Sequence, residues 1–242
     1  MVLWCYVSFH LYLVKSSNIM KRPHKLSHFT ILIFLIALIS SAFALDYPKL
    51  QEGFVKKYTA AGLPTFSAWH NFMLGANDFE ADQKTKRSNE TINRIITWQE
   101  DQKIWNMPDY WATPLETIGK KMGDCEDFAI IKYFTLKNLG VPINQLRLVY
   151  VKAKNGNGTS GSEQAHMVLA YYPTPDGEPF ILDNMLSDIR PASRRPDLTP
   201  VFSFNSEGIY NGAAGKDQQA GGIERLSKWQ DLLLRAQLEG FN

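Results

Sequence analysis

Residues 124–139 constrain the fold more than any other part of this sequence. Their apolar side chains cover nearly the whole circumference of a helix, and such a helix has to be buried. Asp124 suits the N-cap position, and the acids that follow it suit the positive end of the helix dipole. Gly140-Val141-Pro142 ends the segment. We therefore expect the rest of the chain to pack around a central helix that begins at an acidic, cysteine-containing turn.

Strands are predicted after this helix. Further helices are predicted before the strand-forming region and after it. The strand predictions cover residues 146–153, 165–172, 179–186 and 201–210, and Gly-, Asn- and Pro-rich turns separate them. The helix predictions cover residues 47–62, 66–74, 80–98, 115–122 and 226–238. Consecutive strands joined by short turns favour an antiparallel sheet. The expected fold class is α+β, with the central helix packed on that sheet.

Residues 1–44 have the order of a secretory signal peptide. A basic cluster at 21–25 precedes an apolar run at 29–39, and an Ala-x-Ala pattern ends at Ala44. The apolar run is short for a membrane span, although an uncleaved anchor is the alternative. Met20 offers a second start, which would make residues 1–19 an upstream extension. We expect residues 45–242 to form a single exported domain with no stable membrane insertion after cleavage.

Charge and cysteine usage change once the leader is set aside. The leader holds four of the 26 basic residues and none of the 24 acidic ones, so the remainder is slightly acidic and does not suggest nucleic-acid binding. Cys5 belongs to the leader, which leaves Cys125 as a lone thiol that cannot form an intramolecular disulfide. A lone cysteine in an exported protein is a candidate reactive group.

Cys125, His166 and Asp183 occur in an order that suits nucleophilic catalysis. The start of a helix lowers a cysteine pKa and favours the thiolate. An imidazole can accept the thiol proton, and a carboxylate on the neighbouring strand can orient that imidazole. His166 and Asp183 lie on consecutive predicted strands, 17 residues apart and facing the helix that Cys125 begins.

Each of these residues also has a structural interpretation. A single buried cysteine is often a small core residue, a strand histidine is often a core residue with a hydrogen-bond partner, and Asp183 could simply end a strand. His70 is the other histidine outside the leader, and we interpret it as structural because it lies in an aromatic helix well before the cysteine. The combination of export, a lone thiol at a helix start and an ordered His and Asp favours catalysis.

These residues resemble a known family, the LapG-type periplasmic cysteine proteases, or bacterial transglutaminase-like cysteine peptidases. The resemblance is clearest over residues 98–188 and is carried by WATP at 111–114, GDCEDFA at 123–129, KYF at 132–134, AHMVL at 165–169 and LDN at 182–184. It implies a papain-like or transglutaminase-like core with Cys125, His166 and Asp183 as a catalytic triad that forms a thioester.

The resemblance also implies calcium (Ca2+), with Asp124 and Glu126 as the best-matched ligands and Asp127 as a third. Calcium prefers several hard oxygen ligands, and three neighbouring carboxylates repel one another unless a cation compensates. The alternative is that Asp124 caps the helix while the other two acids complement its dipole. No EF-hand spacing is present, so the residues alone leave both interpretations open.

Family resemblance further implies a substrate, a controller and a compartment. LapG-like proteases act in the periplasm and cut a large surface adhesin near its N-terminus at a di-alanine site. An inner-membrane receptor for cyclic di-GMP sequesters them, so they link cyclic di-GMP signalling to biofilm release. Small residues around the scissile bond would suit a cleft narrowed by aromatics, for which Trp105, Tyr110 and Trp111 are candidates, although each could equally be a core residue.

Two other functions are compatible with the same residues. A transglutaminase or amidase would use the same triad and the same thioester, with an amine in place of water as the acceptor. A non-catalytic module that binds calcium or the adhesin would not need Cys125 at all.

Overall fold

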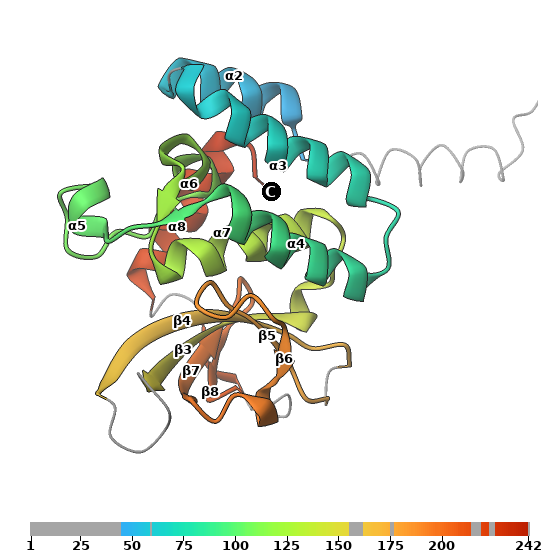
Figure 1. Cartoon of the computed structure of the whole chain (residues 1–242), viewed down its shortest axis with the longest axis vertical. Helices are drawn as coiled ribbons and strands as arrows, with labels where there is room; N and C mark the ends of the chain where they lie inside the picture. Colours follow the sequence, from blue (N-terminus) through green and yellow to red (C-terminus); the bar gives the residue numbers. More distant parts are fainter. Residues whose placement is uncertain are drawn as a thin grey trace, which may run out of the picture. The chain divides into compact units, whose positions relative to one another are not determined.

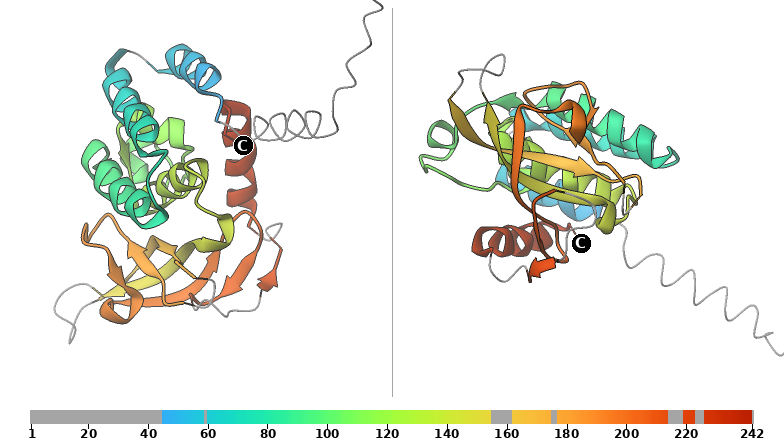
Figure 2. Two further views of the ribbon diagram at one scale, coloured as in Figure 1. Left: turned by 90° about the vertical axis from the view of Figure 1, so that its right-hand side faces the viewer. Right: turned by 90° about the horizontal axis from the view of Figure 1, so that it is seen from below.

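Helices and an antiparallel sheet form two layers in the computed structural model of this protein (Figures 1 and 2). The structure describes residues 45–241, except residue 59 and residues 155–161, 175–176, 214–218 and 223–225. All of them belong to one unit, Phe43–Asn242. The leader predicted over residues 1–44 lies outside the described residues.

The helices that precede the sheet come from the first half of this unit, and one more closes the chain. They are α2 (Tyr47–Lys57), η2 (Ala60–Gly62), α3 (Leu63–Ala76), α4 (Ala81–Ile95), α5 (Asp101–Ile104), α6 (Pro114–Lys120), α7 (Cys125–Asn138) and α8 (Ser227–Glu239). None of the helices among the described residues is both long and apolar enough to cross a membrane.

Helix α7 is central, as its sequence predicted. Residues 127–136 of this helix are all buried, and the described helices and the sheet enclose it (Figure 1). Its side chains share one apolar core with Trp69 of α3, Trp229 of α8 and the helix-facing side of the sheet. Because a helix buried all round can move only with its neighbours, residues at its first turn are held firmly relative to the sheet.

The main sheet has the strand order β6-β5-β4-β3-β7-β8-β9, and every neighbouring pair is antiparallel. Its strands are β3 (Leu146–Lys154), β4 (Glu163–Tyr171), β5 (Phe180–Leu182), β6 (Arg190–Pro191), β7 (Leu198–Phe204), β8 (Ile209–Asn211) and β9 (Gln219–Gly221). The short 3-10 helix η3 (Ile143–Gln145) lies between α7 and β3, and η4 (Ala192–Arg194) lies between β6 and β7. A separate parallel pair joins β1 (Thr97–Trp98) to β2 (Met122–Gly123), just before α7.

Side chains along the strands alternate between the two faces of the sheet, and both faces are buried. Leu146 and Leu148 of β3 and Met167 and Leu169 of β4 join the core beneath the helices. The intervening Val149, Val151, Val168 and Ala170 form a second cluster on the opposite face, against which Ala192, Leu198 and Ala213 pack. Both faces are apolar because the second is also covered, by η4, the first residue of β7 and the segment after β8.

The predicted α+β class, with the cysteine-bearing helix on an antiparallel sheet, is confirmed. Four boundaries differ most. The helix expected over residues 80–98 ends at Ile95, and Thr97–Trp98 form strand β1 instead. The helix expected over residues 47–62 ends at Lys57 and resumes as a short 3-10 turn. The strand expected over 179–186 stops at Leu182. The strand expected over 201–210 is two strands, since the Asn205 side chain accepts hydrogen bonds from the N–H groups of Glu207 and Gly208 and closes a turn.

Candidate active site

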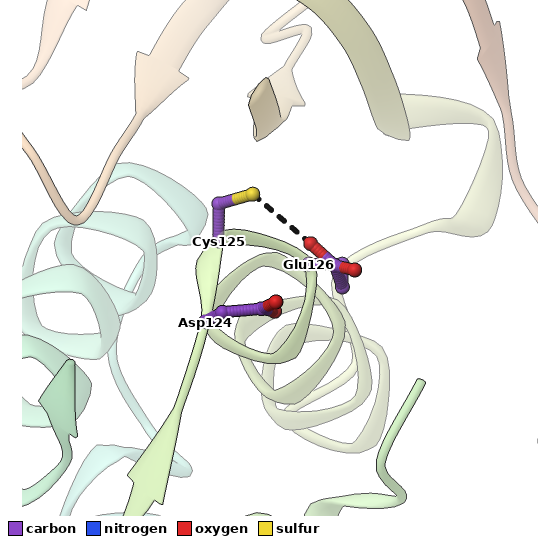
Figure 3. Close-up of side chains that lie close together, drawn as sticks. All are labelled: Asp124, Cys125 and Glu126. Atoms are coloured by element: carbon purple, nitrogen blue, oxygen red, sulfur yellow. Dashed lines mark hydrogen bonds between the residues drawn. The ribbon is translucent and has the colours of Figure 1, made fainter. Parts of the chain in front are cut away.

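Cys125 is the first residue of α7 and is partly exposed. Asp124 precedes it at the N-cap position, and the β1–β2 pair leads into this turn from the other side. The thiol Sγ is turned toward the neighbouring carboxylate and donates to Glu126 Oε2 at 3.0 Å (Figure 3). The predicted location at a helix start is therefore confirmed, with an acidic partner at hydrogen-bonding distance.

The Cys125 pKa differs from the sequence-based expectation. A helix start alone should lower it, but burial raises the pKa of this thiol, and the charge and hydrogen bond of Glu126 raise it further. A hydrogen bond from the backbone N–H of Met167, on β4, acts in the opposite direction. Burial and the neighbouring carboxyl groups therefore favour the protonated form of the Cys125 thiol.

His166 and Asp183 form a buried pair, as their positions on consecutive strands predicted. His166 is on β4, and Asp183 immediately follows β5, which pairs with β4. The distance from His166 Nε2 to Asp183 Oδ1 is 2.9 Å. An ionised carboxylate can only accept, so Nε2 carries the proton and Nδ1 is left as the acceptor. That tautomer is the one in which an imidazole can act as a base.

Arg195 holds the other oxygen of Asp183. Its Nη2 donates to Asp183 Oδ2 at 2.8 Å, and its guanidinium also bonds Asp197. Burial alone would raise the Asp183 pKa, but the hydrogen bonds from His166, the Met185 N–H and Arg195 lower it to about 2. The carboxylate is thus kept ionised and fixed in orientation by two cationic or donor side chains.

Helix α4 fixes the backbone around Asp183. Asn93 Nδ2 donates to the Asp183 carbonyl at 2.8 Å, and Asn89 Nδ2 donates to the Ser187 carbonyl at 2.9 Å. The Asp183 Oδ1 atom also accepts from the Met185 N–H at 3.0 Å. These bonds turn the chain away from the sheet after Leu182, which is why β5 is shorter than predicted.

A cleft of about 540 Å³ brings the cysteine and the histidine together. Its walls are Trp98, Glu100, Asp124, Cys125, Gln164, Ala165, His166, Asn184 and Met185. The aromatic residue in this wall is Trp98. The three aromatics proposed from sequence are engaged elsewhere: Trp111 stacks on Phe204, Trp105 packs on Tyr110, and the Tyr110 hydroxyl donates to Glu116.

His70, the other histidine outside the leader, is not among the cleft-lining residues. Its ring packs against Tyr47 in the helical layer, with 4.1 Å between ring centroids, and lies 6.1 Å from that of Phe66. These contacts agree with the structural role expected for it.

An acidic cluster lies beside Cys125 and includes an acid that the sequence reasoning missed. One carboxylate oxygen each from Asp101, Asp124 and Asp127 can be chosen so that all three lie within 4.8 Å of one another. Asp101 Oδ1, Asp124 Oδ1 and Asp127 Oδ2 are all buried and have no hydrogen-bond partner among the described residues. Glu126 belongs to two overlapping groups, one with Asp124 and Cys125 and one with Asp101 and Asp109.

The protein compensates this cluster only in part, through backbone N–H groups of Tyr110 and Ala112 that donate to the other oxygens of Asp101 and Asp127. Asp124 occupies the N-cap position, yet its side chain makes no capping hydrogen bond, which removes the alternative that it serves as a simple helix cap. Burial and the neighbouring acids raise the pKa of Asp124, and burial raises that of Asp127 well above its usual range. Burial also raises the Asp101 pKa to about 6. Buried carboxylates that each keep one oxygen without a hydrogen-bond partner suit a hard cation with oxygen ligands.

Comparison with known protein families identifies the family of this chain. The family model described as bacterial transglutaminase-like cysteine proteinase BTLCP matches residues 70–196, which include Cys125, His166 and Asp183. The chain belongs to this family of cysteine proteinases. No curated protein sequence matched the chain.

Solved structures of LapG from Legionella pneumophila are similar to this member of the family. One is 39% identical with a TM-score of 0.66, covering 80% of this chain and 98% of that one. An EGTA-treated form is 38% identical with a TM-score of 0.67, over 80% and 98%. A calcium-bound form is 39% identical with a TM-score of 0.65, over 78% and 97%. Together with the family match, they establish a transglutaminase-like cysteine protease fold.

Asp101 and Arg195 are the site residues that sequence reasoning did not find. Asp101 begins the four-residue helix α5 and Arg195 follows a 3-10 turn in a Pro- and Arg-rich loop. Neither position carries a periodic or motif signal, because each contributes to the site only through a long-range contact. The available clue was charge type, since a buried carboxylate such as Asp183 needs a cationic partner.

Proposed function

We propose that this chain is a calcium-dependent periplasmic cysteine endopeptidase that cleaves a large surface adhesin. Cleavage near the adhesin N-terminus at a di-alanine site would release the adhesin and so control biofilm attachment. The observation that carries the proposal is the shared cleft of Cys125 and His166, in which the His166 ring is bonded to a buried, ionised Asp183. Membership of a cysteine proteinase family supports the reaction class.

In the proposed reaction the Cys125 sulfur attacks the scissile carbonyl carbon. His166 accepts the thiol proton at Nδ1, because Nε2 is committed to Asp183, and then delivers that proton to the leaving amine. The resulting thioester is hydrolysed by a water that His166 deprotonates in turn. The backbone N–H of Cys125, at the start of α7, is suited to stabilise the oxyanion.

Calcium fits the acidic cluster beside the nucleophile. We assign Asp101, Asp124 and Asp127 as the groups whose partnerless oxygens would hold the ion, with Glu126 as a further ligand from the same turn. When bound, the ion would neutralise the acids whose charge opposes thiolate formation. The calcium-bound structure of LapG, a similar protein, supports calcium as the ion.

The remaining parts of the proposal concern the cell. The predicted leader would deliver the protein to the periplasm. There an inner-membrane receptor that senses cyclic di-GMP would sequester the protease until release is required. These proposals rest on family resemblance and on similarity to LapG rather than on any contact within the described residues.

The decisive experiment compares surface and secreted proteins from cells with the wild-type chain and with Cys125→Ala. Mass spectrometry should locate one cleavage site between two alanines near the N-terminus of a large adhesin, present with the wild type and absent with the variant. His70→Ala should retain cleavage, since His70 belongs to the helical layer. A cross-linked adhesin in place of two fragments would indicate a transglutaminase, and cleavage by Cys125→Ala would contradict the thiol mechanism.

A further inference from the structure

Residues 110–112 hold two acids of the acidic cluster through their main chain. The N–H of Tyr110 donates to Asp101 Oδ2, and the N–H of Ala112 donates to Asp127 Oδ1 at 2.8 Å. In each of these carboxylates the other oxygen is buried and has no hydrogen-bond partner among the described residues. Because a carboxylate is planar, a bond to one oxygen restricts where the other can point. The segment therefore sets the positions of two oxygens that are available to an ion.

Arg235 of α8 holds the opposite side of one of these peptide units. Its Nη2 donates to the Trp111 carbonyl at 2.7 Å. That carbonyl and the N–H of Ala112 belong to the same planar peptide unit, which directs them to opposite sides. A chain of hydrogen bonds therefore runs from Arg235, through a single peptide unit, to the carboxylate of Asp127.

The same guanidinium also restrains Tyr110, whose main chain holds Asp101. Arg235 Nη1 donates to the Tyr110 hydroxyl at 3.1 Å and to Glu116 Oε2 at 2.6 Å. The hydroxyl in turn donates to Glu116 at 3.0 Å. The guanidinium carbon lies 5.0 Å from the centre of the Tyr110 ring, close enough for a cation–π contact. Arg235 therefore contacts the segment at both of the places from which it holds an acid.

The groups on either side of Arg235 are themselves fixed by packing. Glu116 is buried and forms a capping box with Thr113 at the start of α6. On α8, Trp229 and Leu232 are fully buried in the core. Because neither helix can shift without disturbing the core, Arg235 holds the segment at a defined distance from α7.

We propose that Arg235 is a positioning residue for the calcium site and sets the calcium affinity from the C-terminal helix. By fixing the Trp111 carbonyl and the Tyr110 side chain, it holds the carboxylates of Asp101 and Asp127 in place before the ion arrives. Ligands that are already ordered bind an ion more tightly, because binding no longer has to order them. This inference rests on the calcium site of the proposed function and extends it to a residue outside the acidic cluster.

Positioning and charge predict opposite effects of removing Arg235. A guanidinium repels a cation, so through charge alone its removal would strengthen calcium binding. Through positioning, its removal releases the Trp111 carbonyl and loosens the two carboxylates, so calcium would bind more weakly. The sign of the change in affinity therefore separates the two effects.

The first test measures the calcium Kd by isothermal titration calorimetry, at a temperature at which each variant is folded. For Arg235→Met we expect calcium to bind about tenfold more weakly, as is usual when a residue that orients metal ligands is lost. Lys57→Met is the matched control, because it removes the same charge from beside Glu116 and leaves the Trp111 carbonyl bonded. The Lys57 side chain is 51% exposed and its charge is screened, so its loss should change the Kd by less than about twofold.

Arg235→Lys tests the geometry of the guanidinium rather than its charge. Lysine keeps a cation beside the buried Glu116, but a single ammonium cannot reproduce the planar fork that reaches a carboxylate and a carbonyl together. We therefore expect Arg235→Lys to fold and still to bind calcium several-fold more weakly than the wild type. A residue needed only for its charge or for general stability would be rescued by lysine.

Terbium (Tb3+) in place of calcium gives a second readout that general stability does not change. Terbium is a hard cation that takes oxygen ligands, and its luminescence decay in H2O and in D2O reports how many water molecules coordinate it. A carboxylate oxygen that moves out of position is replaced by water. We expect more coordinated water in Arg235→Met and Arg235→Lys than in the wild type, and no change in Lys57→Met.

The outcomes separate this inference from the proposed function. If the wild type binds calcium and both Arg235 variants bind it as tightly or more tightly, the positioning role is wrong and the calcium site stands. Full rescue by Arg235→Lys, or an equal loss in Lys57→Met, would also contradict the positioning role. If the wild type binds neither calcium nor terbium, the calcium site and this inference both fail. Should Arg235→Met not fold, Arg235→Lys still decides the question, because it keeps the cation beside Glu116.

Discussion

At the scale of single residues, Asp183 depends on Arg195 as much as on His166. Arg195→Met would leave one oxygen of a buried carboxylate without its cationic partner, and removing one member of a buried ion pair costs about 3 kcal/mol of unfolding free energy. Urea unfolding at neutral pH measures the loss. Arg190→Met is the control, because the Arg190–Asp188 pair is exposed and should contribute under about 1 kcal/mol. Equal losses in the two variants would contradict a special role for Arg195.

The low pKa of Asp183 makes stability depend on pH on the acid side. Its folded-state pKa of about 2 lies below the ordinary 3.8, so its contribution is present above pH 4 and is lost as pH falls through both values. The full contribution is about 2 kcal/mol, of which about 1 kcal/mol disappears between pH 5 and pH 3. Unfolding free energies at these two pH values should fall less steeply in Asp183→Asn than in the wild type. Asp188→Asn, which changes an exposed acid, should keep the wild-type slope.

At the scale of elements, the start of α7 requires a glycine at position 123. A Cβ there would lie 2.6 Å from the Cβ of Asp127 and 3.0 Å from its Oδ2. Gly123→Ala would therefore displace the acid cluster together with the first turn of the helix. We expect a loss of about 2 kcal/mol in urea unfolding, as for an overpacked core, and weaker calcium binding by calorimetry.

Gly53→Ala in α2 is the matched control for this glycine. Nothing lies within 4 Å of a Cβ at Gly53, so alanine should be neutral there or stabilise the helix by up to about 1 kcal/mol. If Gly123→Ala behaves like Gly53→Ala in both measurements, the turn is less closely packed than the structure shows.

At the scale of the whole molecule, the acid cluster links α5 to the start of α7, so a bound ion would stabilise the folded unit. Thermal unfolding should shift upward with calcium and return with EGTA while magnesium is kept constant. Ligand at about a hundred times its Kd contributes about 2.7 kcal/mol. An unfolding temperature unaffected by EGTA would contradict the calcium proposal.

Asp101→Asn gives the corresponding prediction for the proposed ligand that the sequence did not reveal. Without calcium this variant should be more stable than the wild type, because one of several mutually repelling buried carboxylates becomes neutral. With calcium it should lose most of the gain, because a ligand is missing. Asp78→Asn, at an exposed position, should change neither value. A variant that keeps the full calcium-dependent shift would exclude Asp101 as a ligand.

Local pattern was sufficient to predict most of the elements and the candidate reacting groups of this protein. The all-round apolar character of residues 124–139 predicted a buried central helix, and alternation predicted β3 and β4 with nearly their observed ends. The order of Cys125, His166 and Asp183 on a helix and two consecutive strands predicted which side chains could meet. These features depend on residues close in the chain, whose spacing a sequence displays directly.

Tertiary structure alone decided what surrounds those groups. Arg195 reaches Asp183, Asp101 joins the acids at the start of α7, and the aromatic wall of the cleft is Trp98 rather than Trp105, Tyr110 or Trp111. It also decided that burial and Glu126 raise the Cys125 pKa against the helix dipole. Such properties arise from desolvation and from contacts between distant segments, which no local spacing encodes. The sequence therefore specified the candidate nucleophile and its candidate partners, and the packed fold specified the electrostatic environment around them.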